Sequence, residues 1–388
     1  MDTVDTSGSE QDAAQAGLVY VTDGQPGIRR VRRGKRFAYV GPDDRPLTDA
    51  AALDRIARLA IPPAYTDVWI CRHPRGHLQA TGRDARGRKQ YRYHAQWRIA
   101  RDGNKFERME DFGAALPRLR RRLNRDLALA GLPREKVLAV VGNLLDTTRV
   151  RIGNPAYARD NNSFGLTTLR NRHVSFIRDQ RALLRFRGKG GADHEVVVDD
   201  RRIVRIVRHC QDLPGQRLFQ YVDDAGDRHP VDSEMVNAYL REAMSGEFTA
   251  KDFRTWGATV RAISLLACTP LPESRSERAL NACIVKAVRK VAEELRNTPA
   301  VCRKSYINPV VFAAWRSGAL HDVVGTGPSA RDAERVALRF LSTPSAQLKQ
   351  KKPAAPGTAA ARTIARSPTR SPASGRQRPV GAGARVAA

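Results

Sequence analysis

A chain of 388 residues that is 41% hydrophobic can bury a substantial core, and its length favours two domains over one. Lys and Arg outnumber Asp and Glu by 68 to 40, and the resulting formal charge of +28 predicts a nucleic acid as partner. Five cysteines without a CxxC pair argue against a disulfide framework or a zinc site. No secretory leader and no membrane-length apolar run is evident, so we expect a cytoplasmic protein, although a genome rich in Arg codons could also explain the arginine excess.

The two ends of the chain are expected to be disordered. Residues 1–17 are small, polar and acidic, whereas residues 346–388 carry nine basic residues and no acidic one among Ala, Pro, Ser and Gly. Such compositions cannot bury a core. The basic tail is either an arm that adds non-specific affinity for DNA or an inert extension.

Residues 18–100 are predicted to form a small β-rich domain. Strand-like runs occupy residues 18–21, 37–40 and 68–71, and Gly, Pro and Asp turns separate them. A helix is predicted over residues 49–59, ahead of the Pro62-Pro63 break. We expect this region to be a DNA-binding domain.

Residues 101–345 are predicted to be mainly helical, which makes the fold class α+β. The clearest helix spans residues 279–295, where apolar side chains recur at spacings of three and four and indicate a core stripe. Within this region, residues 181–187 alternate as a strand, residues 188–191 form a glycine-rich turn and residues 194–198 return. A small β-hairpin is therefore expected inside the helical domain.

Metal-free attack on a phosphodiester requires a defined set of side chains. A nucleophile must bond to phosphorus, fixed donors must stabilise charge on the non-bridging oxygens, and the departing sugar oxygen must receive a proton. A tyrosine with two arginines and a lysine supplies that set.

Four segments carry a specific resemblance. Residues 82–94, 151–169, 251–257 and 297–306 resemble, in this order, the motifs of type IB DNA topoisomerases of the bacterial, poxvirus-like kind. The resemblance spans nearly the whole region expected to be ordered. It implies the catalytic fold shared by tyrosine recombinases and type IB topoisomerases, and a monomeric, C-shaped clamp on double-stranded DNA in the nucleoid.

The resemblance also implies residue roles. Tyr306 would be the nucleophile that forms a 3′-phosphotyrosyl bond, and Arg151 and Arg254 would clamp the scissile phosphate. Lys189, at the tip of the predicted hairpin, would donate a proton to the 5′ oxygen, since a long cation on a loop can swing toward bound DNA. Lys251, one turn before Arg254 if that stretch is helical, would be an auxiliary acid or phosphate contact.

Some positions depart from the viral pattern. Asn297 stands where viral members have a histidine, and its amide can still donate a hydrogen bond to a phosphate oxygen. Gly190 and Asn154 replace a viral Asp and Lys at DNA-contact positions, so the viral sequence preference is not expected to hold. Tyr157 is retained as a DNA contact.

The segment at residues 82–94 implies further DNA contacts. Arg88, Gln90, Tyr91 and Tyr93 match DNA-facing positions of the family. Tyrosine hydroxyls can bond phosphates and glutamine can reach base edges. Taken singly, each of these residues, like each catalytic candidate, is more often a surface or packing residue, and His194 is expected to be structural.

Two other functions remain open at this point. A tyrosine recombinase shares the catalytic set but usually has a helical N-terminal domain, and a non-enzymatic basic protein that coats DNA would account for the charge. No GxxxxGK[ST] loop, HExxH motif or carboxylate cluster is present, so neither ATP nor a required metal nor another cofactor is expected.

Overall fold

The computed structural model describes residues 10, 13–34, 36–97, 105–178, 180–325 and 332–344. The basic tail at residues 346–388 and the predicted domain boundaries near residues 100 and 345 lie outside the described residues. Residues 13–15 are helical, and Ala13 packs with Leu18 and Trp97. The division of the chain at residues 17, 100 and 345 stays a prediction.

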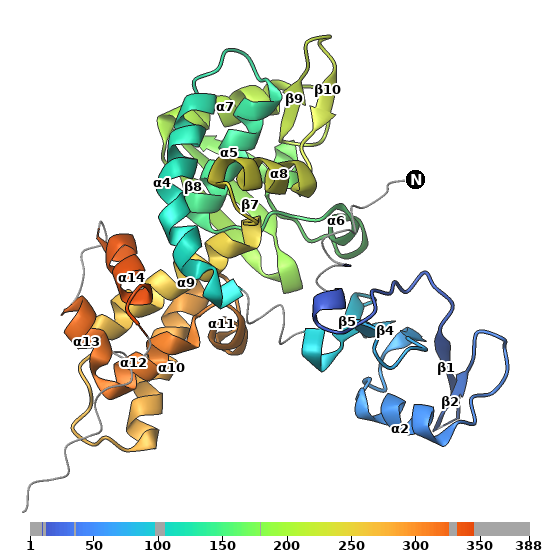
Figure 1. The fold of residues 1–388 in the computed structure, drawn as a ribbon. Coiled ribbons are helices and arrows are strands. Elements are labelled where there is room, and N and C mark those ends of the chain that lie inside the picture. Colours follow the sequence, from blue (N-terminus) through green and yellow to red (C-terminus); the bar gives the residue numbers. More distant parts are fainter. Residues whose placement is uncertain are drawn as a thin grey trace, which may run out of the picture. The chain divides into compact units, whose positions relative to one another are not determined.

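A five-stranded antiparallel sheet dominates residues 13–97 (Figure 1). Its strand order is β2-β1-β3-β4-β5, and the strands are β1 (Ile28–Arg33), β2 (Arg36–Val40), β3 (Thr66–Ile70), β4 (Leu78–Arg83) and β5 (Lys89–Tyr93). The strands predicted near residues 37–40 and 68–71 are confirmed. The strand predicted at residues 18–21 is wrong: Val19 makes only an isolated bridge to Gly76, because Leu18 and Val21 are buried in separate side-chain clusters instead of along a ladder.

Helix α2 (Ala50–Arg58) confirms the helix predicted in this region. The Asp49 carboxylate accepts hydrogen bonds from the Ala51 and Ala52 N–H groups and so caps its first turn. Ile56 is the buried residue of the helix, and it packs in a cluster with Ile70 and other apolar residues of the sheet. A single amphipathic helix therefore supplies part of the core of this small sheet.

The rest of the described chain is mainly helical, and the fold class is α+β as predicted. The helices in chain order are α4 (Met109–Asp126), α5 (Arg134–Thr148), α6 (Pro155–Asn161), α7 (Arg201–Asp212), α8 (Ser233–Met244), α9 (Ala250–Ala267), α10 (Glu277–Glu294), α11 (Pro299–Ser305), α12 (Pro309–Ser317), α13 (Ala319–Val324) and α14 (Ala333–Leu341). Helix α10 confirms the predicted core stripe, since Ile284 and Val291 are fully buried.

Short strands interrupt the helices. The predicted hairpin is confirmed as β7 (Arg181–Arg187) and β8 (Asp193–Val198), which pair antiparallel, and β6 (Val174–Ile177) adds a third strand beside β7. A further small pair, β9 (Gln220–Val222) and β10 (Arg228–Pro230), was not predicted, because strands of three residues carry too little periodicity to detect.

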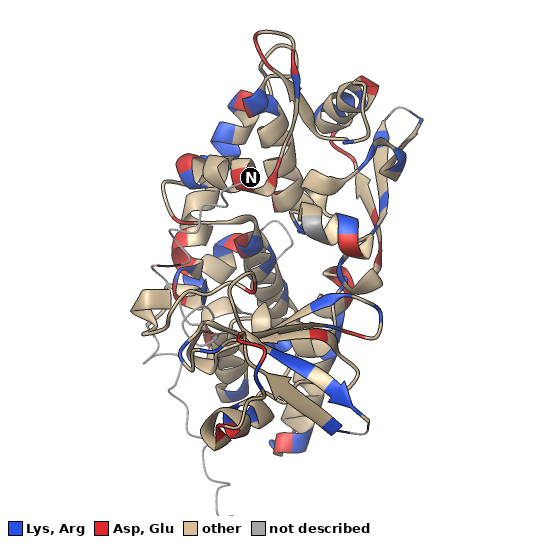
Figure 2. Cartoon of the chain, turned by 90° about the vertical axis from the view of Figure 1, so that its right-hand side faces the viewer, with Lys and Arg blue, Asp and Glu red and all other residues tan. Residues whose placement is uncertain are grey.

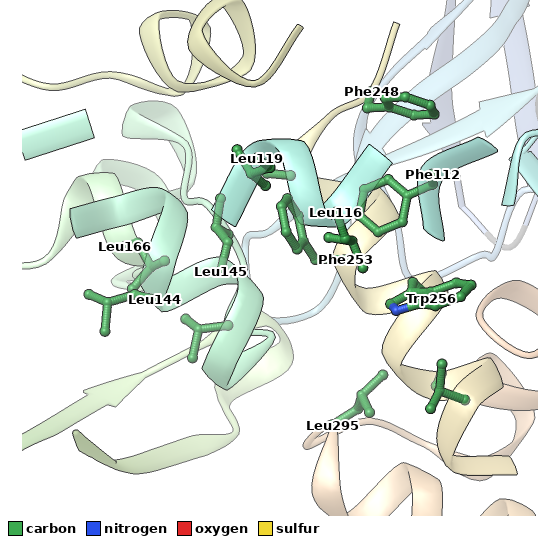
Figure 3. Close-up of a cluster of buried hydrophobic side chains, with 14 of the residues drawn as sticks. Phe112, Leu116, Leu119, Leu144, Leu145, Leu166, Phe248, Phe253, Trp256 and Leu295 are labelled. Carbon is green, nitrogen blue, oxygen red and sulfur yellow. The ribbon is translucent and has the colours of Figure 1, made fainter. Parts of the chain in front are cut away.

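Helix α9 lies at the centre of the helical part. It packs against α4, α5, α10, α12 and α14. Phe112 of α4 meets Phe253 of α9 edge to face at 5.1 Å, and Trp256 lies beside them in the same cluster (Figure 3). Truncating a buried aromatic of this kind typically costs about 3–5 kcal/mol. Helix α9 therefore holds the side chains of its first turn firmly in place.

None of the helices in the described part of the chain is both long and apolar enough to span a bilayer. Basic side chains are spread over strands and helices alike, interspersed with acidic ones (Figure 2).

Candidate active site

A cavity of about 320 Å³ opens in the helical part of the chain and gathers most of the predicted catalytic residues. It receives side chains from the segment before α6, from the β7–β8 turn, from the first turn of α9 and from the end of α11. Its lining comprises Arg151, Ile152, Gly153, Asn154, Tyr157, Ser163, Phe164, Lys189, Ala250, Lys251, Arg254 and Tyr306. Residues that are up to 155 positions apart in sequence thus share one cavity; we call it the Tyr306 pocket.

Arg254 is held by the backbone of two distant segments. The residue is 3% exposed, and its two Nη groups donate to the carbonyl oxygens of Arg149 and Leu295. The first turn of α9 is fixed in turn, because the Asp252 carboxylate accepts from the N–H and hydroxyl of Thr249 at 2.7 and 2.9 Å. These bonds fix the orientation of the guanidinium, whose buried Nε–H has no partner among the described residues.

Arg151 is placed by a close approach of two glycine-containing segments. The Leu166 N–H donates to the Arg151 carbonyl at 2.9 Å, and a Cβ on Gly165 would lie 2.5 Å from that same oxygen. Gly153 faces Gly165 and has a φ of +106°, which favours glycine. The segment that leads from α5 to α6 can adopt this path only with small residues at both positions.

Tyr306 follows the last residue of α11 and is half-buried. Its ring lies 5.1 Å from the Arg254 guanidinium carbon. Burial raises the pKa of the phenol, but the positive charges of Arg254 and Arg151 outweigh burial and lower the pKa below its ordinary value. The surroundings of Tyr306 thus favour the phenolate.

Lys189 sits at the β7–β8 turn, where Gly188 packs so closely on the His194 ring that a Cβ would lie 2.5 Å from it. The residue as a whole is exposed, yet its ammonium end reaches the pocket and lies 5.7 Å from the Tyr157 ring centroid. Shielding of the ammonium from solvent lowers its pKa, and the Arg151 charge lowers it further. Lys189 is consequently a stronger acid than an ordinary lysine.

Asn297 lies just outside the lining of the pocket, two residues after Leu295, whose carbonyl holds Arg254. Its Oδ1 accepts from the Thr298 N–H at 3.2 Å. This bond orients the amide, so that Nδ2 is left as a donor.

Three buried N–H donors in this neighbourhood have no hydrogen-bond partner among the described residues: Arg151 Nη1, Arg254 Nε and Asn297 Nδ2. A buried donor without a partner costs about 1–3 kcal/mol, so such groups are rare unless they serve a ligand. Arg151 and Arg254, which are cationic, line the pocket with Tyr306, and Asn297 lies between α10 and α11, nine residues before Tyr306. The arrangement suits an anion with several oxygens, as a phosphodiester is. Within the described part of the chain, no cluster of three His, Cys, Asp or Glu side chains could hold a metal ion.

A second group of predicted residues lies on the β4–β5 hairpin. Tyr91 and Tyr93 stack with centroids 6.1 Å apart, and both are more than a third exposed. The Asp84 carboxylate accepts hydrogen bonds from Arg88 Nε at 2.9 Å and from Gln90 Nε2 at 3.0 Å, and Arg88 lowers the Asp84 pKa to about 2. One acidic residue therefore engages two of the four predicted DNA contacts of this hairpin.

Sequence reasoning missed several residues of the Tyr306 pocket. Phe164 lines it, and the Gly153–Gly165 contact shapes it. Both Phe164 and Gly165 lie within residues 151–169, the second of the four motifs. An unusual run of glycine and aromatic residues beside a predicted phosphate contact was the signal available, but it does not reveal which backbone groups come together.

Comparison with protein families links this geometry to a known group. Residues 94–313 match the model for the catalytic core of eukaryotic DNA topoisomerase I, and residues 36–84 match the model for the N-terminal domain of bacterial DNA topoisomerase IB. The first match runs from before α4 into α12, and the second includes strands β2, β3 and β4 of the five-stranded sheet.

Comparison with individual proteins also finds DNA topoisomerases. The chain is 33% identical to the DNA topoisomerase 1B of Acanthamoeba polyphaga mimivirus over 286 residues, which cover 72% of the chain and 85% of the viral protein. It is 23% identical to the DNA topoisomerase 1B of Vaccinia virus (strain Copenhagen) over 289 residues, which cover 71% of the chain and 86% of that protein. The DNA topoisomerase I of Monkeypox virus is similar to the same extent.

Proposed function

Since the chain belongs to the type IB DNA topoisomerase family, we propose that it relaxes positive and negative supercoils by cutting and resealing one DNA strand through Tyr306. The single observation that supports this most is the set of three buried, unpartnered donors around a tyrosine whose pKa is lowered. These features match what a metal-free attack on a phosphodiester requires.

In the proposed cleavage step, Tyr306 Oη forms a bond to phosphorus while the bond from phosphorus to the 5′ oxygen breaks. The phenol gives up its proton to water, which the lowered pKa favours, and the 5′ oxygen receives one from Lys189. The 3′ end is then held as a phosphotyrosyl ester, and the free 5′ end rotates about the intact strand. Religation is the reverse attack, and the number of phosphoester bonds is conserved, so torsion in the DNA drives the relaxation and ATP is not consumed.

Charge on the phosphate is proposed to be stabilised from two sides. Arg151 Nη1 and Arg254 Nε are fixed donors on charged groups, and Asn297 Nδ2 adds a neutral one. Removing one donor of this type costs roughly 10²–10³ in rate in acyl transfer, which indicates the scale of the effect. Lys251, on the first turn of α9 at the pocket edge, serves as an auxiliary acid or phosphate contact.

Lys189 is proposed to protonate the 5′ oxygen as it leaves. Support comes from its place at a turn that lines the pocket and from its lowered pKa. A lysine whose pKa approaches the working pH transfers its proton more readily than an ordinary one.

On DNA, we propose that the five-stranded sheet and the helical part close around the duplex as a monomeric clamp. Arg88, Gln90, Tyr91 and Tyr93 would contact DNA from the β4–β5 hairpin and Tyr157 from the Tyr306 pocket. The enzyme would act on the nucleoid, and its interaction with DNA would weaken steeply as salt rises, since phosphate contacts release counterions.

The test is trapping with detergent after incubation with supercoiled plasmid, without ATP or magnesium. The native chain should leave a covalent adduct on the 3′ side of a nick, whereas Tyr306→Phe should leave none while still binding DNA. An adduct through another residue, or persistent cleavage by the variant, would contradict the assignment.

The same experiment addresses the two alternatives. A protein that only coats DNA would leave no adduct, and a tyrosine recombinase would exchange strands between paired sites instead of relaxing a lone plasmid. The family matches support the topoisomerase over both.

A further inference from the structure

Helix α9 makes a second contact with the segment that carries the nucleophile, away from the Tyr306 pocket. Thr259 is fully buried in the middle of the helix. Its hydroxyl donates to the Tyr306 carbonyl oxygen at 3.2 Å and accepts from the Asn308 N–H at 3.1 Å. One side chain of α9 thus binds the backbone on both sides of the turn between α11 and α12.

These two backbone groups lie where helical hydrogen bonds stop. Tyr306 is the first residue after α11, with φ −124° and ψ −30°, so its carbonyl is outside the helical ladder. Asn308 precedes α12 and caps it, since its side chain accepts from the Val310 N–H at 3.1 Å. Buried backbone groups at helix ends need partners, and the Thr259 hydroxyl serves one acceptor and one donor at once.

The same helix carries part of the phosphate-binding set. Arg254 precedes Thr259 by five residues, which is about 7.5 Å along a helix axis. Both residues are almost completely buried, and α9 is packed by aromatic side chains on its other faces. The distance between the guanidinium of Arg254 and the Tyr306 backbone is therefore set through a short, rigid path.

We propose that Thr259 is a positioning residue for the nucleophile. By holding the Tyr306 backbone in register with α9, it keeps the phenol in line with a phosphate that Arg254 contacts. The proposal rests on the proposed function, because it takes Tyr306 as the nucleophile. A displacement of about 1 Å at a reacting group can lower the rate about 10²-fold. Loss of the Thr259 hydroxyl can therefore change the rate of cleavage strongly.

The test compares Thr259→Val, which has nearly the same shape and no hydroxyl, with Thr259→Ser, which keeps the hydroxyl. In single-turnover cleavage of a duplex oligonucleotide, the Val variant should cleave about 10- to 100-fold more slowly, while Ser stays within a few-fold of the native rate. DNA affinity should be the same in all three proteins, because Thr259 is buried.

A pH profile separates positioning from simple support of the fold. Without the hydroxyl, the phenol is less tightly held beside Arg254 and Arg151, so the rising limb of the rate against pH should move to higher pH in Thr259→Val. Thr269→Val is the control, since Thr269 follows the end of α9 and its hydroxyl donates to the Leu265 carbonyl of that helix at 2.7 Å, away from Tyr306. This control should keep the native rate and profile.

The outcomes are distinct. Native cleavage and an unchanged pH profile in Thr259→Val, with a lower melting temperature alone, would overturn the proposal. If the Val variant fails to fold, Thr259→Ala gives the same comparison, because it lacks the hydroxyl and adds no bulk. Failure of the proposed function would look different: Tyr306→Phe would still form the covalent adduct, whatever the Thr259 variants did.

Discussion

The proposed phosphate binding near Tyr306 depends on buried N–H groups that have no hydrogen-bond partner among the described residues. Arg254 uses its two Nη groups on backbone carbonyls and keeps Nε, while Asn297 uses Oδ1 and keeps Nδ2. In each case the bonds that the side chain makes to the protein orient the donor that remains. Such preorganisation would allow the neutral amide to contribute to the proposed phosphate binding.

The amide of Asn297 therefore predicts a specific loss of function. Asn297→Ala removes the Nδ2 donor and should slow single-turnover cleavage by roughly 10²-fold, with little change in DNA affinity. Asn297→His, which can also donate from a ring nitrogen, should recover most of that loss. Equal rates for the native and Ala proteins would show that Nδ2 does not contact the phosphate.

At the scale of elements, the β7–β8 hairpin presents Lys189 because its two strands are packed together next to the turn. Phe186 and His194 face each other across the two strands and stack with centroids 4.9 Å apart. Burial first, and then the charges of Arg151 and Arg254, lower the pKa of His194 to about 4. The hairpin is thus built around a histidine that stays neutral at physiological pH.

This lowered pKa predicts how stability depends on pH. Between the ordinary pKa of about 6.5 and about 4, the unfolded chain binds a proton at His194 and the folded protein does not, so acidification favours unfolding. The free energy of unfolding should fall through this window by as much as about 3 kcal/mol. Urea unfolding at about pH 7 and about pH 4 measures it. His194→Phe, which keeps the stack, should flatten the dependence, and an unchanged slope would exclude His194 as its source.

The Glu334 carboxylate of helix α14 bonds to two other helices of the core. Glu334 accepts hydrogen bonds from both Nη groups of Arg120 at 2.7 and 3.0 Å and from Trp256 Nε1 at 3.3 Å, and Arg120 also pairs with Asp146. Trp256 belongs to α9, two residues after Arg254. The end of the described chain is in this way connected to the helix that carries the proposed phosphate contacts.

Glu334→Gln should consequently lower the free energy of unfolding by about 1 kcal/mol, since the group is about a third exposed and solvent screens the charge. Arg335→Gln on the same helix breaks an ion pair with Asp332 in which the Arg335 side chain is 81% exposed, and it should change stability by less than about 0.5 kcal/mol. Denaturant midpoints compare the two. Similar midpoints for both variants would show that the Glu334 contacts carry no special weight.

For the whole molecule, the net charge of +28 sets the affinity for DNA more than any single contact. Arg88 and Gln90 are bonded to Asp84, so part of the basic surface is already internally paired. The nine basic residues of the tail at residues 346–388 have no acidic neighbours within that segment.

Removal of residues 346–388 should therefore weaken non-specific DNA binding and reduce the slope of log affinity against log salt by several units, while the cleavage rate at saturating enzyme is unchanged. Binding measured across a salt series tests this. An identical slope with and without the tail would identify it as an inert extension.

The sequence by itself determined the family and indicated the chemical types of the proposed catalytic residues. Four motifs in a fixed order indicate the family. The apolar stripe of α10 predicts a helix, and the glycine-rich turn predicts a hairpin. The helix predicted over residues 49–59, ahead of the Pro62-Pro63 break, corresponds to α2.

Only the tertiary structure decided which donors of these residues remain for a ligand. Arg254 meets the Arg149 and Leu295 carbonyls across 105 and 41 residues of sequence, and Thr259 meets Tyr306 across 47. These contacts involve backbone groups, which every residue has. A pattern of side chains in the sequence therefore cannot predict them. Burial increases the energetic effect of each of these hydrogen bonds. A donor that is removed from water can bond only to the partner that folding places beside it.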